Sequence, residues 1–122
     1  MSVAKNQSFP TRLLFALTGL RHGLSAERSL QVQASVFVCV LVALVALRPG
    51  PLWWALVLVA SAAVFAAELL NTSLEHLIDH LHPEIDPQIR IVKDCAAAAV
   101  LITVFGAIAV AVCLAVELLR HR

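Results

Sequence analysis

Residues 95–116 read CAAAAVLITVFGAIAVAVCLAV and contain no charged side chain. A helix that crosses a bilayer needs about 20 such residues, so this stretch by itself predicts a membrane span. The rest of the chain agrees with it. Hydrophobic residues make up 61% of the 122 positions and charged residues 14%, whereas ordinary soluble domains carry about a quarter charged residues. We therefore expect residues 1–122 to form a single integral membrane domain.

Two further apolar stretches precede this one. Residues 32–47 end at Arg48-Pro49-Gly50-Pro51, and residues 52–67 end at Glu68. Each reaches bilayer length only if its helix continues through the polar residues beside it, which predicts spans over about 30–47, 52–72 and 95–118. Proline and glycine turn the chain at 49–51, and the segment from His82 to Pro87 breaks it again.

The segment before the first span is amphipathic. Its leucines recur at helical spacing, while the polar residues fall elsewhere (Leu13, Leu14, Leu17, Leu20 and Leu24 against Arg21, His22 and Ser25). This pattern predicts a helix over about 10–28 that lies in the membrane interface, or equally one that packs on the bundle. Residues 1–28 lack the apolar core and cleavage site of a secretory signal, so we expect them in the mature protein. The expected fold class is all-α, with three transmembrane helices and an N-terminal interfacial helix.

The distribution of positive charge predicts the orientation. Six lysines and arginines lie before the first span or between the second and third, and three lie on the other side (Lys5, Arg12, Arg21, Arg28, Arg90 and Lys93 against Arg48, Arg120 and Arg122). Since positive residues stay on the cytoplasmic side, we expect the N-terminus and residues 72–94 in the cytoplasm and the C-terminus outside. A net charge of +1 and the absence of a basic stripe give no reason to expect nucleic-acid binding.

The end of the second span carries a stripe of polar side chains. At about 100° per residue, Asn71, Glu75 and Asp79 lie within about 60° of Glu68 on the helix surface. Carboxylates four residues apart repel each other slightly, so helix stability does not explain the stripe. An ionisable residue inside a transmembrane segment is a functional candidate. We therefore interpret Glu68 and Glu75 as functional, whereas Asp79 fits a solvated position equally well.

Other charged residues reach the same predicted membrane surface. Glu27 precedes the first span, and Lys93-Asp94 precedes the third. Carboxylates are suitable ligands for Mg²⁺, and a lysine suits a phosphate. Any one of these residues could be an interfacial anchor, but their convergence favours a site for a phosphorylated ligand.

Three other classes of protein remain as alternatives. A small proton-coupled transporter could use Glu68 as its proton carrier, but would not need Glu27, Glu75 and Lys93-Asp94 on one side. A metal-binding membrane protein could use His76, His80 and His82, although we expect these to be solvated histidines in a polar turn region. A purely structural subunit would not explain the carboxylate stripe.

Two motifs resemble a known family. Glu68-Leu-Leu-Asn71-Thr-Ser-Leu-Glu75 and Lys93-Asp94-Cys-Ala-Ala-Ala-Ala-Val-Leu are similar to the signature segments of the prokaryotic diacylglycerol kinases, and Glu27 stands where that family has its N-terminal glutamate. The resemblance covers about residues 12–116. The segment Glu27-Arg28-Ser29-Leu30-Gln31-Val32-Gln33 is more similar to the version found in undecaprenol kinases.

The resemblance implies an ATP-dependent lipid kinase of the plasma (inner) membrane, a homotrimer whose active sites are shared between subunits. Diacylglycerol is the expected acceptor, with undecaprenol as the alternative. Glu68 would be the general base, and Glu27 and Glu75 would hold Mg²⁺. The remaining residues expected around the nucleotide are Asn71, Lys93, Asp94, Glu84 and Asp86, the last at a position where the family often has histidine. No P-loop motif is present.

Overall fold

The computed structural model describes residues 6–121 and contains four helices in that range, α1 (Phe9–Ala26), α2 (Arg28–Leu47), α3 (Pro51–Leu81) and α4 (Pro87–Arg120). Helices α2, α3 and α4 are each long and apolar enough to cross a membrane. The all-α fold with three candidate spans and a preceding helix is thus confirmed. Lys5 and Arg122, two of the residues used to predict the orientation, lie outside the described residues.

Prolines and caps set the ends of the helices. Pro10, Pro51 and Pro87 stand in the first turns of α1, α3 and α4, where a missing backbone N–H costs nothing. Helix α2 ends at Arg48, which adopts the left-handed conformation with φ 50° and ψ 50°. The following Pro49-Gly50-Pro51 then starts α3, so the predicted turn between the first two spans is present.

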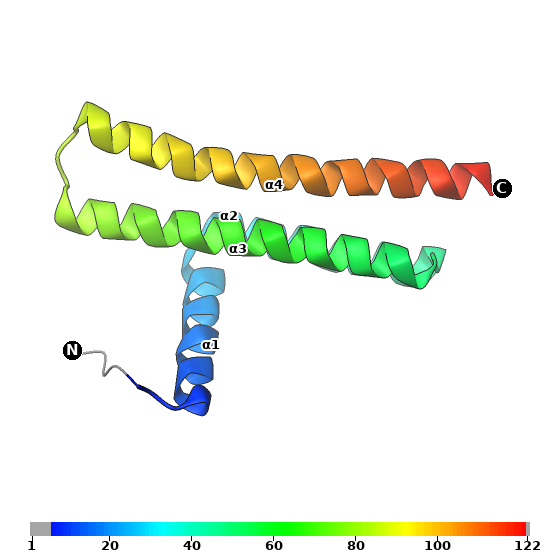
Figure 1. The fold of residues 1–122 in the computed structure, drawn as a ribbon, viewed down its shortest axis with the longest axis horizontal. Helices are drawn as coiled ribbons and strands as arrows, with labels where there is room; N and C mark the ends of the chain where they lie inside the picture. Colours follow the sequence, from blue (N-terminus) through cyan, green and yellow to red (C-terminus); the bar gives the residue numbers. More distant parts are fainter. Residues whose placement is uncertain (1–5, 122) are drawn as a thin grey trace.

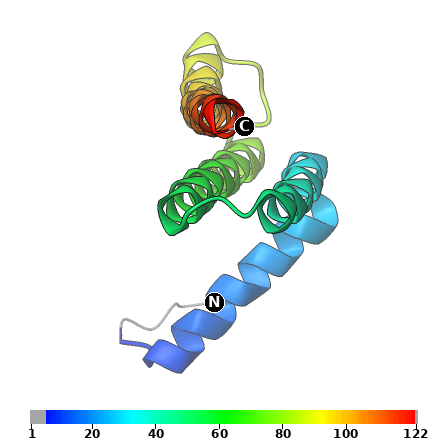
Figure 2. The same cartoon turned by 90° about the vertical axis from the view of Figure 1, so that its right-hand side faces the viewer.

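Helices α2, α3 and α4 run side by side, with α3 between the other two (Figure 2). Antiparallel α3 and α4 pack along most of their length. Helix α1 leaves this group transverse to it, at the point where α2 begins (Figure 1). The exposed leucines of α1 and its transverse direction favour the membrane interface, which is one of the two placements that the sequence allowed.

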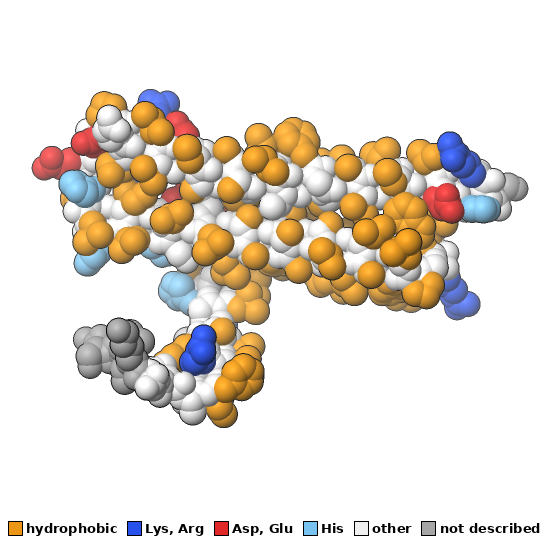
Figure 3. Space-filling view, in the orientation of Figure 1, with side chains coloured by type: hydrophobic (Ala, Val, Ile, Leu, Met, Phe, Trp, Pro, Cys, Tyr) orange, Lys and Arg blue, Asp and Glu red, His pale blue; other side chains and the backbone are white. Residues whose placement is uncertain are grey.

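Little of the apolar surface is buried within one chain. Leu44, Val57 and Leu114 form a small core, and Leu114 is the one buried residue of α4 among those described. Apolar side chains cover the outside of the three spans as a band between two charged ends (Figure 3). Such a surface is stable in contact with lipid or with other apolar helices, and not in water.

Helices α3 and α4 are longer than a bilayer is thick. Their 31 and 34 residues correspond to roughly 46 and 51 Å at 1.5 Å per residue, against about 30 Å for the hydrocarbon core. The excess lies at the α3–α4 turn, which extends past the level of α1 (Figure 1). The polar residues 72–94 therefore belong to a helical hairpin that stands beyond the membrane interface.

Candidate active site at the α1–α2 junction

Glu68 is the one buried charged residue among residues 6–121, with 8% of its surface exposed. It lies on α3, near the depth at which α1 joins α2, and its carboxylate makes no hydrogen bond to any described residue. A charged residue that lies largely within the bundle and whose carboxylate has no hydrogen-bond partner does not contribute to stability. Stability therefore does not explain Glu68, and its functional role stays a prediction.

One turn further along α3, Asn71 and Glu75 interact directly. The Asn71 Nδ2 donates a hydrogen bond to Glu75 Oε1 over 3.2 Å, and the half-buried amide thereby orients the carboxylate. Asn71 Oδ1 is buried and has no hydrogen-bond partner. A buried acceptor without a donor is unusual and needs a ligand or water to satisfy it. The predicted stripe of Glu68, Asn71 and Glu75 is thus present, with an open acceptor at its centre.

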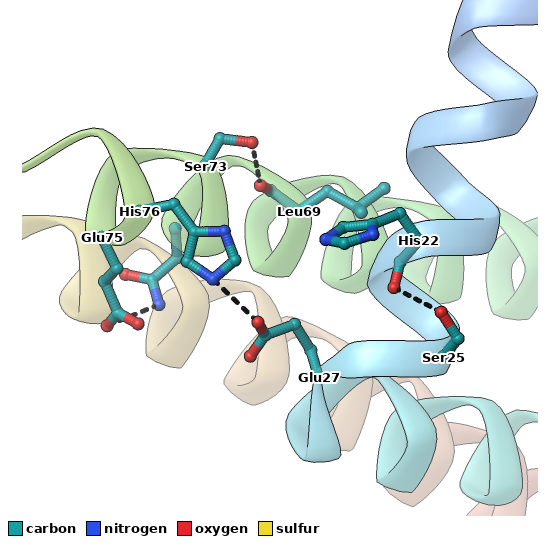
Figure 4. A network of polar contacts seen from close by, with 8 residues as sticks. His22, Ser25, Glu27, Leu69, Ser73, Glu75 and His76 are labelled. Atoms are coloured by element: carbon teal, nitrogen blue, oxygen red, sulfur yellow. Dashed lines mark hydrogen bonds and ion pairs between the residues drawn. The ribbon is translucent and has the colours of Figure 1, made fainter. Parts of the chain in front are cut away.

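Glu27 is the one-residue link between α1 and α2. Its extended backbone (φ −104°, ψ 117°) ends the first helix and begins the second, and its N–H donates to Gly23 O over 2.9 Å. The Glu27 side chain points toward α3, where its Oε1 accepts a hydrogen bond from His76 Nε2 over 2.9 Å (Figure 4). Glu27 is thereby attached to the residue next to Glu75.

The described residues contain no group of three or more His, Cys, Asp or Glu side chains placed to hold a metal ion. Mg²⁺ needs less than that from a protein, because it keeps several waters and takes one or two carboxylates together with substrate phosphates. The Glu27 and Glu75 carboxylates are donors of the kind that Mg²⁺ takes, and the unsatisfied Asn71 Oδ1 could accept from a metal-bound water.

The other predicted site residues lie on α4 or before it. Lys93 bonds to Asp79 of α3, so this lysine is paired within the chain. Asp94 and Glu84 are exposed and make no hydrogen bond to a described residue. The Asp86 side chain caps α4 by accepting from Gln88 N over 2.7 Å, which gives it a structural role.

Two contacts were missed by the sequence analysis. His76 and His80 are four residues apart on α3, as their spacing predicts, because nothing before Pro83 interrupts the helix, and His82 caps its end. The bond between His76 and Glu27 spans 49 positions, and no local pattern indicates it. Asp79 was recognised as part of the stripe, but its pairing with Lys93 was not.

The sequence profile described as prokaryotic diacylglycerol kinase matches residues 14–115. The chain belongs to this family. The matched range contains α2 and α3 in full, most of α1 and α4, and every candidate site residue.

Two curated relatives of the prokaryotic diacylglycerol kinase family have similar sequences. A protein of Synechocystis sp. named diacylglycerol kinase is 31% identical over 101 residues, which cover 82% of this chain and 58% of the relative. A Bacillus subtilis protein named undecaprenol kinase is 31% identical over 74 residues, which cover 61% of this chain and 60% of the relative. The aligned part is thus under two thirds of either relative's length. No solved structure shows a significant match.

Proposed function

We propose that this chain transfers the γ-phosphoryl group of ATP to the hydroxyl of a membrane lipid alcohol, with Glu68 as the general base. The observation that carries the proposal is Glu68 itself, a largely buried residue whose carboxylate makes no hydrogen bond to a described residue and which shares an α3 face with Asn71 and Glu75. Membership of the diacylglycerol kinase family supports this reaction over the proton-coupled transporter considered above.

The surroundings of Glu68 suit a substrate that arrives from the bilayer. A groove lined almost entirely by apolar side chains runs along α2, α3 and α4, and Gln33 and Phe65 lie toward its Glu68 end. A lipid tail can lie at this depth, while the primary hydroxyl reaches the boundary where Glu68 sits. Glu68 would then accept the hydroxyl proton as the oxygen attacks phosphorus.

The remaining residues would hold the nucleotide in line with that hydroxyl. Phosphoryl transfer needs positioning and charge neutralisation more than covalent chemistry. Glu27 and Glu75 would bind Mg²⁺, which when bound neutralises charge on the phosphate oxygens. Asn71 would orient Glu75, and Lys93 would exchange Asp79 for a phosphate oxygen. Asp94, Glu84 and Asp86 would lie around the nucleotide.

Diacylglycerol is the acceptor that we propose first, giving phosphatidic acid. Undecaprenol is the second candidate, favoured by the sequence of residues 27–33 and by the similarity to the undecaprenol kinase of Bacillus subtilis. We further propose a homotrimer with shared sites in the plasma (inner) membrane, its N-terminus in the cytoplasm and its C-terminus outside. The exposed apolar faces of the spans leave room for neighbouring subunits.

The test is phosphoryl transfer from radiolabelled Mg-ATP by the protein purified in detergent, with diacylglycerol and undecaprenol offered separately. We expect a labelled phospholipid from one acceptor and none from the Glu68→Gln variant. Failure with both acceptors, in an assay where another member of the family is active, would rule out the proposed reaction.

A further inference from the structure

The contact between Glu27 and His76 joins two parts of the chain that no local structure would bring together. Glu27 is in the link between helices, so its side chain has no neighbouring helical turn to hold it. His76 is on α3, 49 residues away, and supplies the one hydrogen bond that the Glu27 carboxylate makes to a described residue. The direction of the Glu27 carboxylate therefore depends on His76.

The α1–α2 junction packs closely against α3 at Gly23. A Cβ atom at this position would lie 2.8 Å from Leu30 Cδ1 and 3.1 Å from Leu69 Cδ2, and Leu30 is fully buried. Leu69 and His76 are seven residues apart, so they lie on the same face of α3 to within about 20°. One face of α3 thus makes both contacts: its Leu69 packs against Gly23 of the α1–α2 junction, and its His76 bonds to Glu27.

The chemistry of the two groups determines which one donates the hydrogen bond. An ionised carboxylate only accepts hydrogen bonds, so His76 Nε2 carries the hydrogen and donates it to Oε1. This leaves Glu27 Oε2 able to meet a cation. His76 follows Glu75 in sequence, so their side chains leave α3 about 100° apart, and the bond holds Glu27 at the turn of α3 that also carries Glu75.

The bond is too exposed to be explained by stability. The side chains of His76 and Glu27 are 55% and 28% exposed, and ion pairs in contact with water contribute little to folding. A carboxylate that is already fixed in position loses less conformational entropy when a ligand binds, and this improves the affinity for the ligand. Residues that hold metal ligands in this way commonly affect metal binding more than they affect the fold.

We infer that His76 is a positioning residue, which holds the Glu27 carboxylate against α3, at the turn that carries Glu75, before the metal–nucleotide complex binds. The inference rests on the proposed role of Glu27 as a metal ligand. It assigns to His76 a function that neither motif of the family resemblance contains.

The test measures binding of Mn²⁺, a spectroscopic substitute for Mg²⁺, by electron paramagnetic resonance in the presence of a non-hydrolysable ATP analogue. His76→Leu removes the donor, His76→Gln keeps an N–H at similar reach, and His80→Leu changes an exposed histidine one turn away that does not contact Glu27. We expect about tenfold weaker Mn²⁺ binding for His76→Leu, as is usual for residues that hold metal ligands. His76→Gln should recover most of the affinity, and His80→Leu should match the wild type.

A double-mutant cycle distinguishes positioning from a general structural effect. In a Glu27→Gln background, His76→Leu should weaken Mn²⁺ binding no further, because the group that it positions is gone. Equal losses in both backgrounds, unchanged binding by His76→Leu, or no Mn²⁺–nucleotide binding by the wild type would each overturn the inference. The readout does not depend on the lipid, so a wild type that binds Mn²⁺ and nucleotide but phosphorylates no acceptor would refute the proposed function alone. Should His76→Leu fail to fold, the comparison of His76→Gln with His76→Ala replaces it.

Discussion

Lys93 on α4 donates a hydrogen bond to Asp79 on α3, with 2.5 Å between Nζ and Oδ1. The pair bridges the two helices of the hairpin that stands beyond the membrane interface. Its side chains are 35% and 63% exposed, so the interaction is screened by water and contributes no more than about 1 kcal/mol. A partner held this weakly can be exchanged for a phosphate oxygen.

Asp79→Asn should therefore lower the KM for ATP. The substitution removes the negative charge that competes with phosphate for Lys93, and the weak pair limits the change to about fivefold or less. Steady-state kinetics over a range of ATP concentrations, with kcat expected to stay within about twofold, provide the measurement. A higher KM would mean that Asp79 holds Lys93 in its productive position.

Glu68→Gln and Glu75→Gln should have different kinetic effects. An amide cannot accept the hydroxyl proton, so Glu68→Gln should reduce kcat by about 10²- to 10⁴-fold while the nucleotide still binds. Glu75→Gln should instead weaken Mg-ATP binding. Glu117→Gln, at the other end of α4, is the matched control and should behave as wild type. Near-normal turnover of Glu68→Gln would show that the base lies elsewhere.

Mixing two inactive variants tests whether sites are shared between subunits. If Glu68 and Glu75 come from one chain and Glu27 from the next, mixed trimers of Glu68→Gln and Glu27→Gln subunits include some complete sites. Activity should then rise above that of either parent, and the role of His76 inferred above, which places Glu27 at the site of its own chain, would be wrong. An inactive mixture, with subunit exchange verified by tagged pull-down, would place all the ligands on one chain and agree with the contact between Glu27 and His76 seen within a chain.

Gly23→Ala should destabilise the protein, although alanine is the better helix former. The added methyl group would press on Leu30 and Leu69, and overpacking at such sites costs about 1–3 kcal/mol. Gly19→Ala in the same helix is the control, because nothing lies within 4 Å of the new Cβ. It should be neutral or stabilising by up to about 1 kcal/mol. Denaturation in detergent micelles measures both, and equal behaviour of the two variants would contradict the close packing at Gly23.

Much of the fold follows from local sequence. The apolar run 95–116 requires a span, and Pro49-Gly50-Pro51 requires a turn, because each depends on a short stretch of chain. The alignment of Glu68, Asn71 and Glu75 follows from helical geometry in the same way.

The contacts between helices could not be predicted. Hydropathy shows where lipid ends but not where a helix ends, so α3 continues to Leu81 and includes His76. Glu27 reaches His76 because Gly23, which lacks a side chain, lets the α1–α2 junction approach Leu69. That approach depends on packing between residues far apart in the sequence. The bond between Lys93 and Asp79 likewise depends on the register of α3 against α4.

The single residue between α1 and α2 has a mechanical consequence. A longer loop would absorb a change of tilt between a helix on the membrane surface and the helices that cross it. Here that tilt can change only through the backbone torsions of Glu27 and its immediate neighbours, and the Glu27 side chain is attached to α3. The surface helix and the Glu27 carboxylate therefore share one flexible point, so bending or thinning of the bilayer would change the position of that carboxylate.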